Sequence, residues 1–207
     1  VTDDRGEPTA LMSSFIDISD RKRAERALKE EREKLRNLHK AVDELQQEDT
    51  EKGLCRTAIK IAEKMLDFEL CAIATLEGEK LVPRANSTEL PPDQTATFKV
   101  GEGITGKTVQ RGETIWGDDV RNFPEAKPGN DDFRAFISSP IGNIGNLQVI
   151  SKEVGSFDKR DVELTEILTG HLRGELKRVS LEEQLRDQAD SIKKTNSKLE
   201  SLHKVAR

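Results

Sequence analysis

The sequence predicts an α+β fold in which an antiparallel sheet with packed helices is flanked by long helices of the coiled-coil type. Apolar residues follow heptad-like spacing near both ends, at 20–47 and 158–206, whereas 67–153 is rich in short, alternating β segments. Charged residues make up 35% of the chain and hydrophobic residues 34%. This balance suits one compact core with long solvated helices.

Composition also excludes several classes of protein. The net charge is -5 with both signs interspersed, so no basic field indicates a nucleic-acid partner. No apolar run is long enough for a membrane span, and the polar opening VTDDRGEP does not resemble a signal peptide. Cys55 and Cys71 stand alone, which favours buried thiols over a disulfide or zinc site. We expect a cytoplasmic protein without membrane contact by this segment.

The N-terminal elements are a hairpin remnant over 1–18, with a turn at DDRGEP, and a helix over 20–47. The helix has a seam of residues spaced by four and three, with one charged member, Glu31. So polar a helix needs a partner helix, although a lone solvated helix is the alternative. The seam residues are Ala24, Leu28, Glu31, Leu35, Leu38, Val42 and Leu45.

A core helix over 50–66 and a β-rich region follow. The helix carries a broad apolar face that includes Cys55 and Met65. The loop 118–131 holds two prolines and a glycine, and its length is typical of a functional or mobile loop. The predicted strands are FELCAIATLEG and EKLVPRA around Gly78, TATFKV, RAFISSPIG, and NLQVISKE.

The last predicted helix spans 158–206, and its heptad phase slips between Val179 and Leu181. The helix either breaks at Ser180 or continues through a stutter, which the absence of Gly and Pro after Gly174 favours. Residues 198–206, KLESLHKVA, resemble 34–42, KLRNLHKAV. A chain of globular modules joined by helical connectors explains this repeat, and a chance match is the alternative. We therefore expect the sequence to be part of a longer protein.

The stretch GEGITGKT at 101–108 fits the phosphate-loop pattern G-x-x-x-x-G-K-[ST]. A phosphate loop needs a buried parallel strand before it and a long helix after it. Here the preceding TATFKV alternates polar and apolar residues, and Gly112 ends the following helix early. We interpret Lys107 and Thr108 as ordinary residues of a short helix, at whose start the backbone amides of 103–106 could contact an anion.

A wider window resembles the GAF domain signature, over roughly 45–178. The segment VGEGITGKTVQRGETIWGDDVRN is similar to its first part, and FRAFISSPIGNIGNLQVISKEVGSFDKRDVELTEILTGHL to its second. The resemblance implies an antiparallel, often six-stranded sheet with a ligand pocket on one face. The residues that carry it are Gly101, Gly103, Ile104, Gly106, Gly112, Ile115, Asp119, Pro140, Gly155, Phe157, Asp161, Val162 and Leu164.

The opening segment FIDISDRKRAERAL resembles the end of a PAS domain, with Asp17, Ile18 and Ser19 at its D-I-T-like motif. The implied organisation is a PAS remnant at 1–19, a connector helix at 20–47, a GAF domain at 48–178, and a coiled-coil linker helix at 179–207 that leads to a further module.

The resemblance allows several ligand classes, and the residues favour none of the known cofactors. Of the cyclic-nucleotide pattern, Lys152, Phe157 and Asp161 are kept, and Lys152 with Asp161 is expected to form a structural ion pair. A bilin would need a cysteine in the pocket, and a reductase would need clustered cysteines. Haem would need an axial ligand, whereas His39, His171 and His203 fall on the flanking helices. We expect no cofactor, no metal and no catalytic residue.

The implied function is a sensory module of a signal-transduction protein. We expect the parent protein to be a sensor histidine kinase of a two-component system, with its catalytic part beyond residue 207, and a transcription regulator is the alternative. A small ligand would bias two packings of dimeric flanking helices, with Glu31 and the phase slip near Ser180 as weak points. The alternative is a ligand-free dimerisation spacer. The candidate pocket residues, some of which could instead pack the core, are Ile104, Thr105, Trp116, Asp118, Phe133, Phe136 and Ser138.

Overall fold

The computed structural model describes residues 22, 40, 42–88, 97–127 and 129–205, with side chains to 198. The chain divides into two units, 1–40 and 41–207, and the sheet and the helices around it belong to the second. The predicted hairpin over 1–18, the segment that resembles a PAS domain, and Glu31 all lie outside the described residues.

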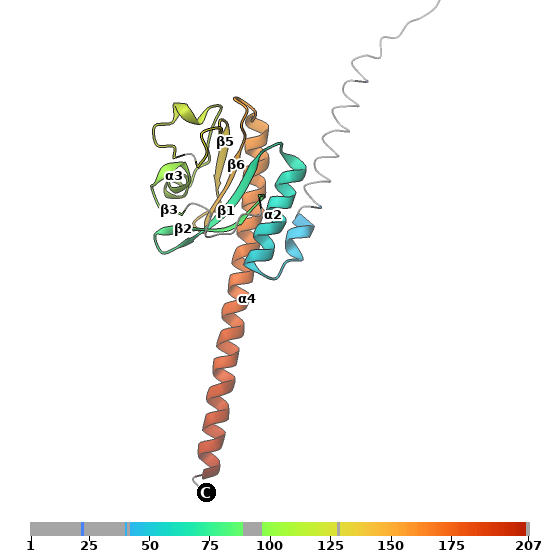
Figure 1. The fold of residues 1–207 in the computed structure, drawn as a ribbon. Helices are drawn as coiled ribbons and strands as arrows, with labels where there is room; N and C mark the ends of the chain where they lie inside the picture. The colour runs from blue at the N-terminus through green and yellow to red at the C-terminus, as the bar shows by residue number, and fades with distance from the viewer. Residues whose placement is uncertain (1–21, 23–39, 41, 89–96, 128, 206–207) are drawn as a thin grey trace, which may run out of the picture. The chain divides into compact units, whose positions relative to one another are not determined.

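The centre of the second unit is a six-stranded sheet with the order β3-β2-β1-β6-β5-β4 (Figure 1). Every neighbouring pair is antiparallel. The predicted α+β class with about six strands is therefore confirmed. The strands are β1 (Leu70–Glu77), β2 (Lys80–Asn86), β3 (Phe98–Lys99), β4 (Ile115–Gly117), β5 (Phe136–Pro140) and β6 (Gly145–Ile150).

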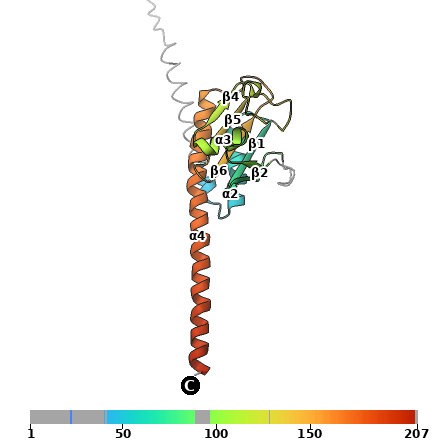
Figure 2. The ribbon, with the colours of Figure 1, turned by 90° about the vertical axis from the view of Figure 1, so that its left-hand side faces the viewer.

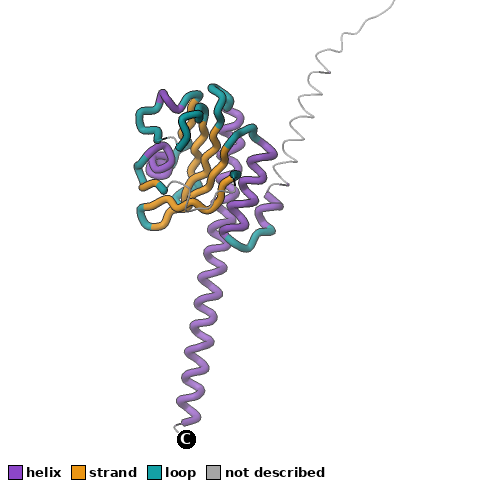
Figure 3. Tube along the Cα trace, viewed as in Figure 1, coloured by secondary structure: helices purple, strands orange, loops and turns teal. Residues whose placement is uncertain are grey.

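Helices α2 (Glu51–Met65) and α4 (Lys159–Val205) pack against each other and cover one face of the sheet (Figure 3). Thr50 caps α2, because its hydroxyl accepts a 3.1 Å hydrogen bond from the Gly53 amide. Successive strand residues point to opposite faces, so Cys71 and Ile73 of β1 enter this core while Ala72 and Ala74 face the other side.

Helix α4 continues unbroken through Ser180, as the stutter interpretation predicts. Leu176 and Val179 are still buried in the core, whereas Leu181 and Leu185 are 57% and 56% exposed. The phase slip thus coincides with the point at which the helix leaves the globular part. Beyond this point α4 runs on past the sheet (Figure 2).

The other face of the sheet carries the short helix α3 (Gly103–Arg111) and the 3-10 turn η2 (Val120–Asn122). A glycine is required at position 106, because a Cβ there would lie 2.2 Å from the Lys99 carbonyl oxygen. Gly106 of the phosphate-loop match therefore lets α3 approach the backbone of β3. Among the described residues, no helix is both long and apolar enough to cross a membrane.

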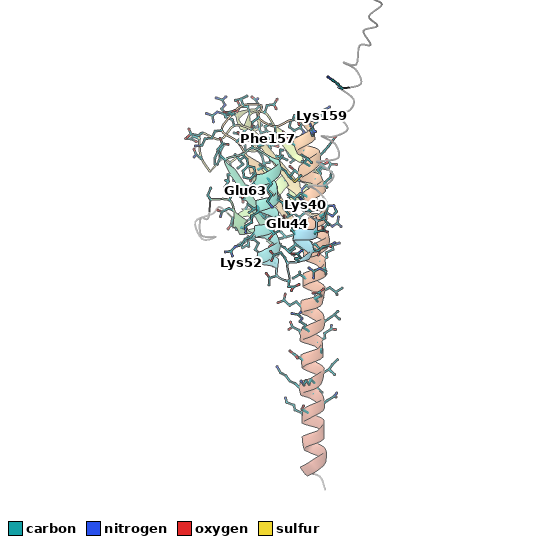
Figure 4. The ribbon with its side chains drawn as sticks, turned by 90° about the vertical axis from the view of Figure 1, so that its right-hand side faces the viewer. Lys40, Glu44, Lys52, Glu63, Phe157 and Lys159 are labelled. Carbon is teal, nitrogen blue, oxygen red and sulfur yellow. The ribbon has the colours of Figure 1, made fainter. Side chains whose placement is uncertain are left out.

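Two details lie at the edge of the helical layer. Glu44, which precedes α2 along the chain and is labelled in Figure 4, forms a 3.0 Å ion pair with Lys64 of α2. Phe157 lies just before α4 and belongs to the main core (Figure 4).

Candidate functional site

A cavity of about 640 Å³ lies between the sheet and the α3 side of the domain. Residues of β1 and β2 form part of its floor, and Ala72 and Ala74 of β1 have no side-chain atoms beyond Cβ to fill the space. Residues of β6, of α3 and of the loop before β5 complete its lining. The cavity is thus on the face opposite α2 and α4.

One end of the cavity is apolar. Ile104 of α3, Val120 of η2 and Phe136 of β5 form a small buried cluster that is separate from the main core. Phe123 packs edge-on against Phe136, with 4.9 Å between ring centroids and 82° between ring planes. This cluster fixes η2 and α3 above the sheet and gives the cavity a rigid apolar wall.

The middle of the cavity is polar because β6 contributes two amides. The Gln148 side chain accepts a 3.0 Å hydrogen bond from the Thr105 hydroxyl of α3. The amide of Asn146 donates a 3.1 Å hydrogen bond to Ser138, which also accepts a 2.8 Å hydrogen bond from Thr108 of α3. Thr108 is fully buried, so it anchors α3 to β5 rather than acting as an ordinary helix residue.

Four charged residues line the cavity: Glu69, Lys127, Arg134 and Lys152. Arg134 is half-buried and the other three are exposed, so they mark the open side of the cavity, its mouth. Lys127 forms a 2.7 Å ion pair with Glu102. The guanidinium of Arg134 donates to backbone carbonyls, including a 2.7 Å bond to Phe133. The ammonium of Lys152 makes no ion pair within the described part of the chain.

The loop that covers this side is held by Asp119. Its carboxylate accepts hydrogen bonds from both the backbone amide and the guanidinium of Arg121, at 3.0 and 2.9 Å. These bonds to Arg121 lower the pKa of Asp119 to about 2. The residue therefore stabilises the start of η2, next to the cavity, without lining it.

Four of the seven candidate pocket residues, Ile104, Thr105, Phe133 and Phe136, line the cavity. The other three do not. Trp116 pairs with Ile137 in the sheet and packs with it against the main core. Asp118 is exposed and contributes a backbone carbonyl to a 3.0 Å bond from the Gly155 amide. Ser138 is fully buried beneath Asn146 and Thr108.

The expected ion pair between Lys152 and Asp161 is not formed. Asp161 instead caps its own helix, because its carboxylate accepts a 2.9 Å hydrogen bond from the Asp158 amide, and Asp158 accepts one of 3.1 Å from the Asp161 amide. The Lys152 amide donates to Glu69 at 2.8 Å, which leaves its side chain at the mouth of the cavity.

Ala72, Ala74, Gln148 and Arg134 also line the cavity and were not among the candidate pocket residues. A usable signal was present in LCAIATLE, the sequence of β1, where two alanines alternate with Cys71, Ile73 and Thr75. Two successive small residues on one face of a central strand leave space above that face.

The residues weighed for cofactor chemistry lie elsewhere. Cys55 and Cys71 are buried in the main core, and neither lines the cavity. Burial raises the pKa of the Cys55 thiol to about 12 and that of Cys71 further still. His171 is exposed on α4. Among the described residues, no three His, Cys, Asp or Glu side chains are grouped to hold a metal ion.

Comparison with known proteins identifies this architecture. A model of the GAF domain family matches residues 48–173. The chain belongs to the GAF domain family. GAF domains are sensory and regulatory modules of signalling proteins. No protein among the curated ones matches the sequence.

Solved structures show the same fold at low sequence identity. The GAF domain of a phosphoenolpyruvate-protein phosphotransferase from Coxiella burnetii has a TM-score of 0.65 at 20% identity, over 72% of this chain and 96% of that one. A free methionine-R-sulfoxide reductase from Neisseria meningitidis, solved with its substrate, has a TM-score of 0.65 at 18% identity, over 83% and 98%. A segment of a methyl-accepting chemotaxis protein reaches 0.58 at 15%, over 68% and 97%.

Proposed function

We propose that this GAF domain is the sensory module of a signal-transduction protein of the sensor histidine kinase type, in which a small ligand in the cavity biases the packing of α4. The observation that carries the proposal is the cavity itself. Its walls are held by α3 and the sheet, and its lining combines an apolar end, two amides and charged groups at the mouth. Such a mixture is typical of small-molecule sites.

A physical route from the cavity to α4 supports the proposal. Ser138 faces the cavity side of β5 and is bonded to Thr108 and Asn146. Ser139, the next residue, faces the helical layer and shares a 3.0 Å hydrogen bond with Thr169 of α4. Because β5 carries both contacts on adjacent residues, a ligand that displaces α3 or Asn146 would also displace the strand that holds α4.

The exposed part of α4 supports a homodimer as the acceptor of this signal. Leu181, Leu185 and Ile192 are 57%, 56% and 62% exposed and lie at seam positions of one heptad register. A parallel partner helix from a second copy would bury them. The polar seam residues Gln188 and Thr195 would weaken that pairing, which suits a helix pair that changes between two packings.

Two related functions share part of this mechanism. A sensor of a transcription regulator would share the ligand and the helices, and differs only in the output module. A ligand-free spacer would share the dimer but not the binding. A reductase-type activity lacks support, because both cysteines are buried in the other layer of the domain.

The test is a thermal-unfolding screen of the chain against small metabolites, with a variant whose cavity is filled. Ala72→Phe places an aromatic ring on the cavity floor, whereas the matched control Val154→Phe adds a ring at a site that is 59% exposed and outside the cavity. We expect saturable stabilisation by at least one metabolite in the wild type and the control, lost in Ala72→Phe. Equal shifts in Ala72→Phe and the wild type would contradict the proposal and favour the spacer.

A further inference from the structure

We infer that the cavity selects an organic anion, a molecule with an apolar body and one carboxylate or phosphate-type head group. The inference rests on the proposed ligand-binding function and adds the chemical class. It comes from the distribution of charge at the mouth compared with the rest of the chain. Three of the four charged residues that line the cavity are basic, although the chain as a whole has a net charge of -5.

One of these three basic residues is neutralised by a carboxylate of the protein, and the other two can pair with a ligand. Lys127 is paired with Glu102. Arg134 has backbone carbonyls as its hydrogen-bond acceptors, those of Asp131 and Phe133. Lys152 has no carboxylate partner in the described part of the chain. Arg134 and Lys152 are therefore the two positive charges that an anion at the mouth would meet.

The nearby carboxylates do not cancel this charge. Asp119 lies close enough to Arg134 for the guanidinium to contribute to its lowered pKa, but both its oxygens are held by Arg121. Glu69 lines the mouth and has one oxygen engaged by the Lys152 amide. An arginine and a lysine facing one free carboxylate favour an anion over a cation or a neutral molecule.

The interior determines the rest of the ligand. Ala72, Ala74, Phe136 and Ile150 on the sheet and Ile104 of α3 opposite them provide apolar surface. Gln148 is the polar group between this surface and the mouth, and its carbonyl oxygen already accepts from Thr105, which leaves its amide hydrogens as donors. An apolar body would lie over the alanines, with the anionic head directed to Arg134 and Lys152.

A matched pair of fluorescent probes tests this inference. Both 8-anilinonaphthalene-1-sulfonate and N-phenyl-1-naphthylamine have the same aromatic body, and only the first has an anionic group. We expect the sulfonate to bind the wild type at least tenfold more tightly than the neutral probe. Ala72→Phe should abolish both, which ties the signal to the cavity.

Charge-neutralising variants identify the groups responsible. Lys152→Gln and Arg134→Gln should each weaken binding of the sulfonate by about tenfold and leave the neutral probe unchanged. Lys60→Gln, an exposed position of α2 on the other layer, is the control and should change neither. Lys152→Gln removes no side-chain bond to any residue that the structure describes, so it keeps the test valid if Arg134→Gln is unstable.

The outcomes separate the two levels of the proposal. If neither probe binds in a way that Ala72→Phe blocks, the ligand-binding function itself fails. If both bind equally and the two variants change neither affinity, the cavity binds ligands but the inferred anion selectivity is wrong. If the sulfonate probe binds selectively, competition identifies the head group. Displacement of the probe by benzoate indicates a carboxylate, and displacement by phenyl phosphate indicates a phosphate ester. Displacement by benzyl alcohol alone would overturn the inference.

Discussion

The guanidinium of Arg178 in α4 donates a 2.7 Å hydrogen bond to the backbone carbonyl of Glu48, 130 residues earlier in the chain. Glu48 lies between the helical residues 42–46 and α2, so this bond joins the start of the GAF domain to the helix that leaves it. Arg178 also forms ion pairs with Glu175 and Glu182 on its own helix, at 2.7 and 3.2 Å. These pairs hold the guanidinium in place for the carbonyl.

Arg178→Ala should therefore lower the stability of the domain, because the Glu48 carbonyl loses its hydrogen-bond donor. Urea unfolding measures this loss. Arg186→Ala, an exposed position two turns later, is the control and should change stability by less than about 0.5 kcal/mol. Equal effects of the two substitutions would show that the bond to Glu48 contributes nothing.

Replacement of Thr108 and Lys107 distinguishes the observed role of GEGITGKT from that of a phosphate loop. Thr108→Val removes a buried 2.8 Å hydrogen bond to Ser138 and should lower the free energy of unfolding by about 1 kcal/mol. Lys107→Ala removes only a partly exposed ion pair with Glu125 and should cost less than about 0.5 kcal/mol. In a phosphate loop, Lys107 would contact the phosphates of a nucleotide and Thr108 its Mg²⁺. Calorimetric titration with ATP and Mg²⁺ should show no saturable binding, and binding that Lys107→Ala abolishes would reverse this interpretation.

Asp119 makes stability depend on acid pH. Its pKa of about 2 in the folded protein lies below the value of about 3.9 expected in the unfolded chain, so the unfolded state takes up a proton first. The stabilisation is complete above about pH 4 and is lost as the pH falls toward 2. Urea unfolding at pH 6 and pH 3 should show a smaller loss for Asp119→Asn than for the wild type. An identical pH dependence would contradict the assigned role.

Two glycines in helices should respond in opposite directions to alanine. A Cβ at Gly106 would lie 2.2 Å from the Lys99 carbonyl oxygen, so Gly106→Ala should cost about 2 kcal/mol or more. At Gly174 of α4 a Cβ meets nothing within 4 Å, so Gly174→Ala should add about 0.5–1 kcal/mol. Thermal unfolding of both variants measures the contrast. Tolerance of alanine at 106 would show that α3 does not need its close approach to β3.

The sequence predicted the long elements well because their signals are local. Thr50 marks the start of α2, and the absence of Gly and Pro after Gly174 explains why α4 is continuous. It predicted the direction of single side chains less well. Strand β4 has three residues, too few to show alternation, and a shift of one residue turns Trp116 from the cavity face to the core face.

Contacts between residues far apart in the chain were also not predictable from the sequence. Asp161 is three residues from Asp158, and the reciprocal cap between them competes with the more distant Lys152. The cavity floor of Ala72 and Ala74 depends on which strands neighbour β1, a fact that the sheet order alone provides. Local competition and strand order therefore explain both errors.

The proposed dimer can be tested at Gln188 of α4. In a parallel pair of helices this position faces its counterpart in the second copy, whereas Asp190 lies on the outer side of the same helix. Gln188→Cys should form an intermolecular disulfide under mild oxidation, and Asp190→Cys should do so at least tenfold more slowly. The native thiols do not interfere, since Cys55 and Cys71 are buried and their raised pKa values disfavour the reactive thiolate. If the two variants cross-link at the same rate, or neither does so at micromolar concentration, the helices do not pair through this seam.

The same variant tests the coupling between the cavity and α4. A metabolite from the screen that changes the cross-linking rate of Gln188→Cys, but not when Ala72→Phe is also present, would connect the cavity to the packing of α4.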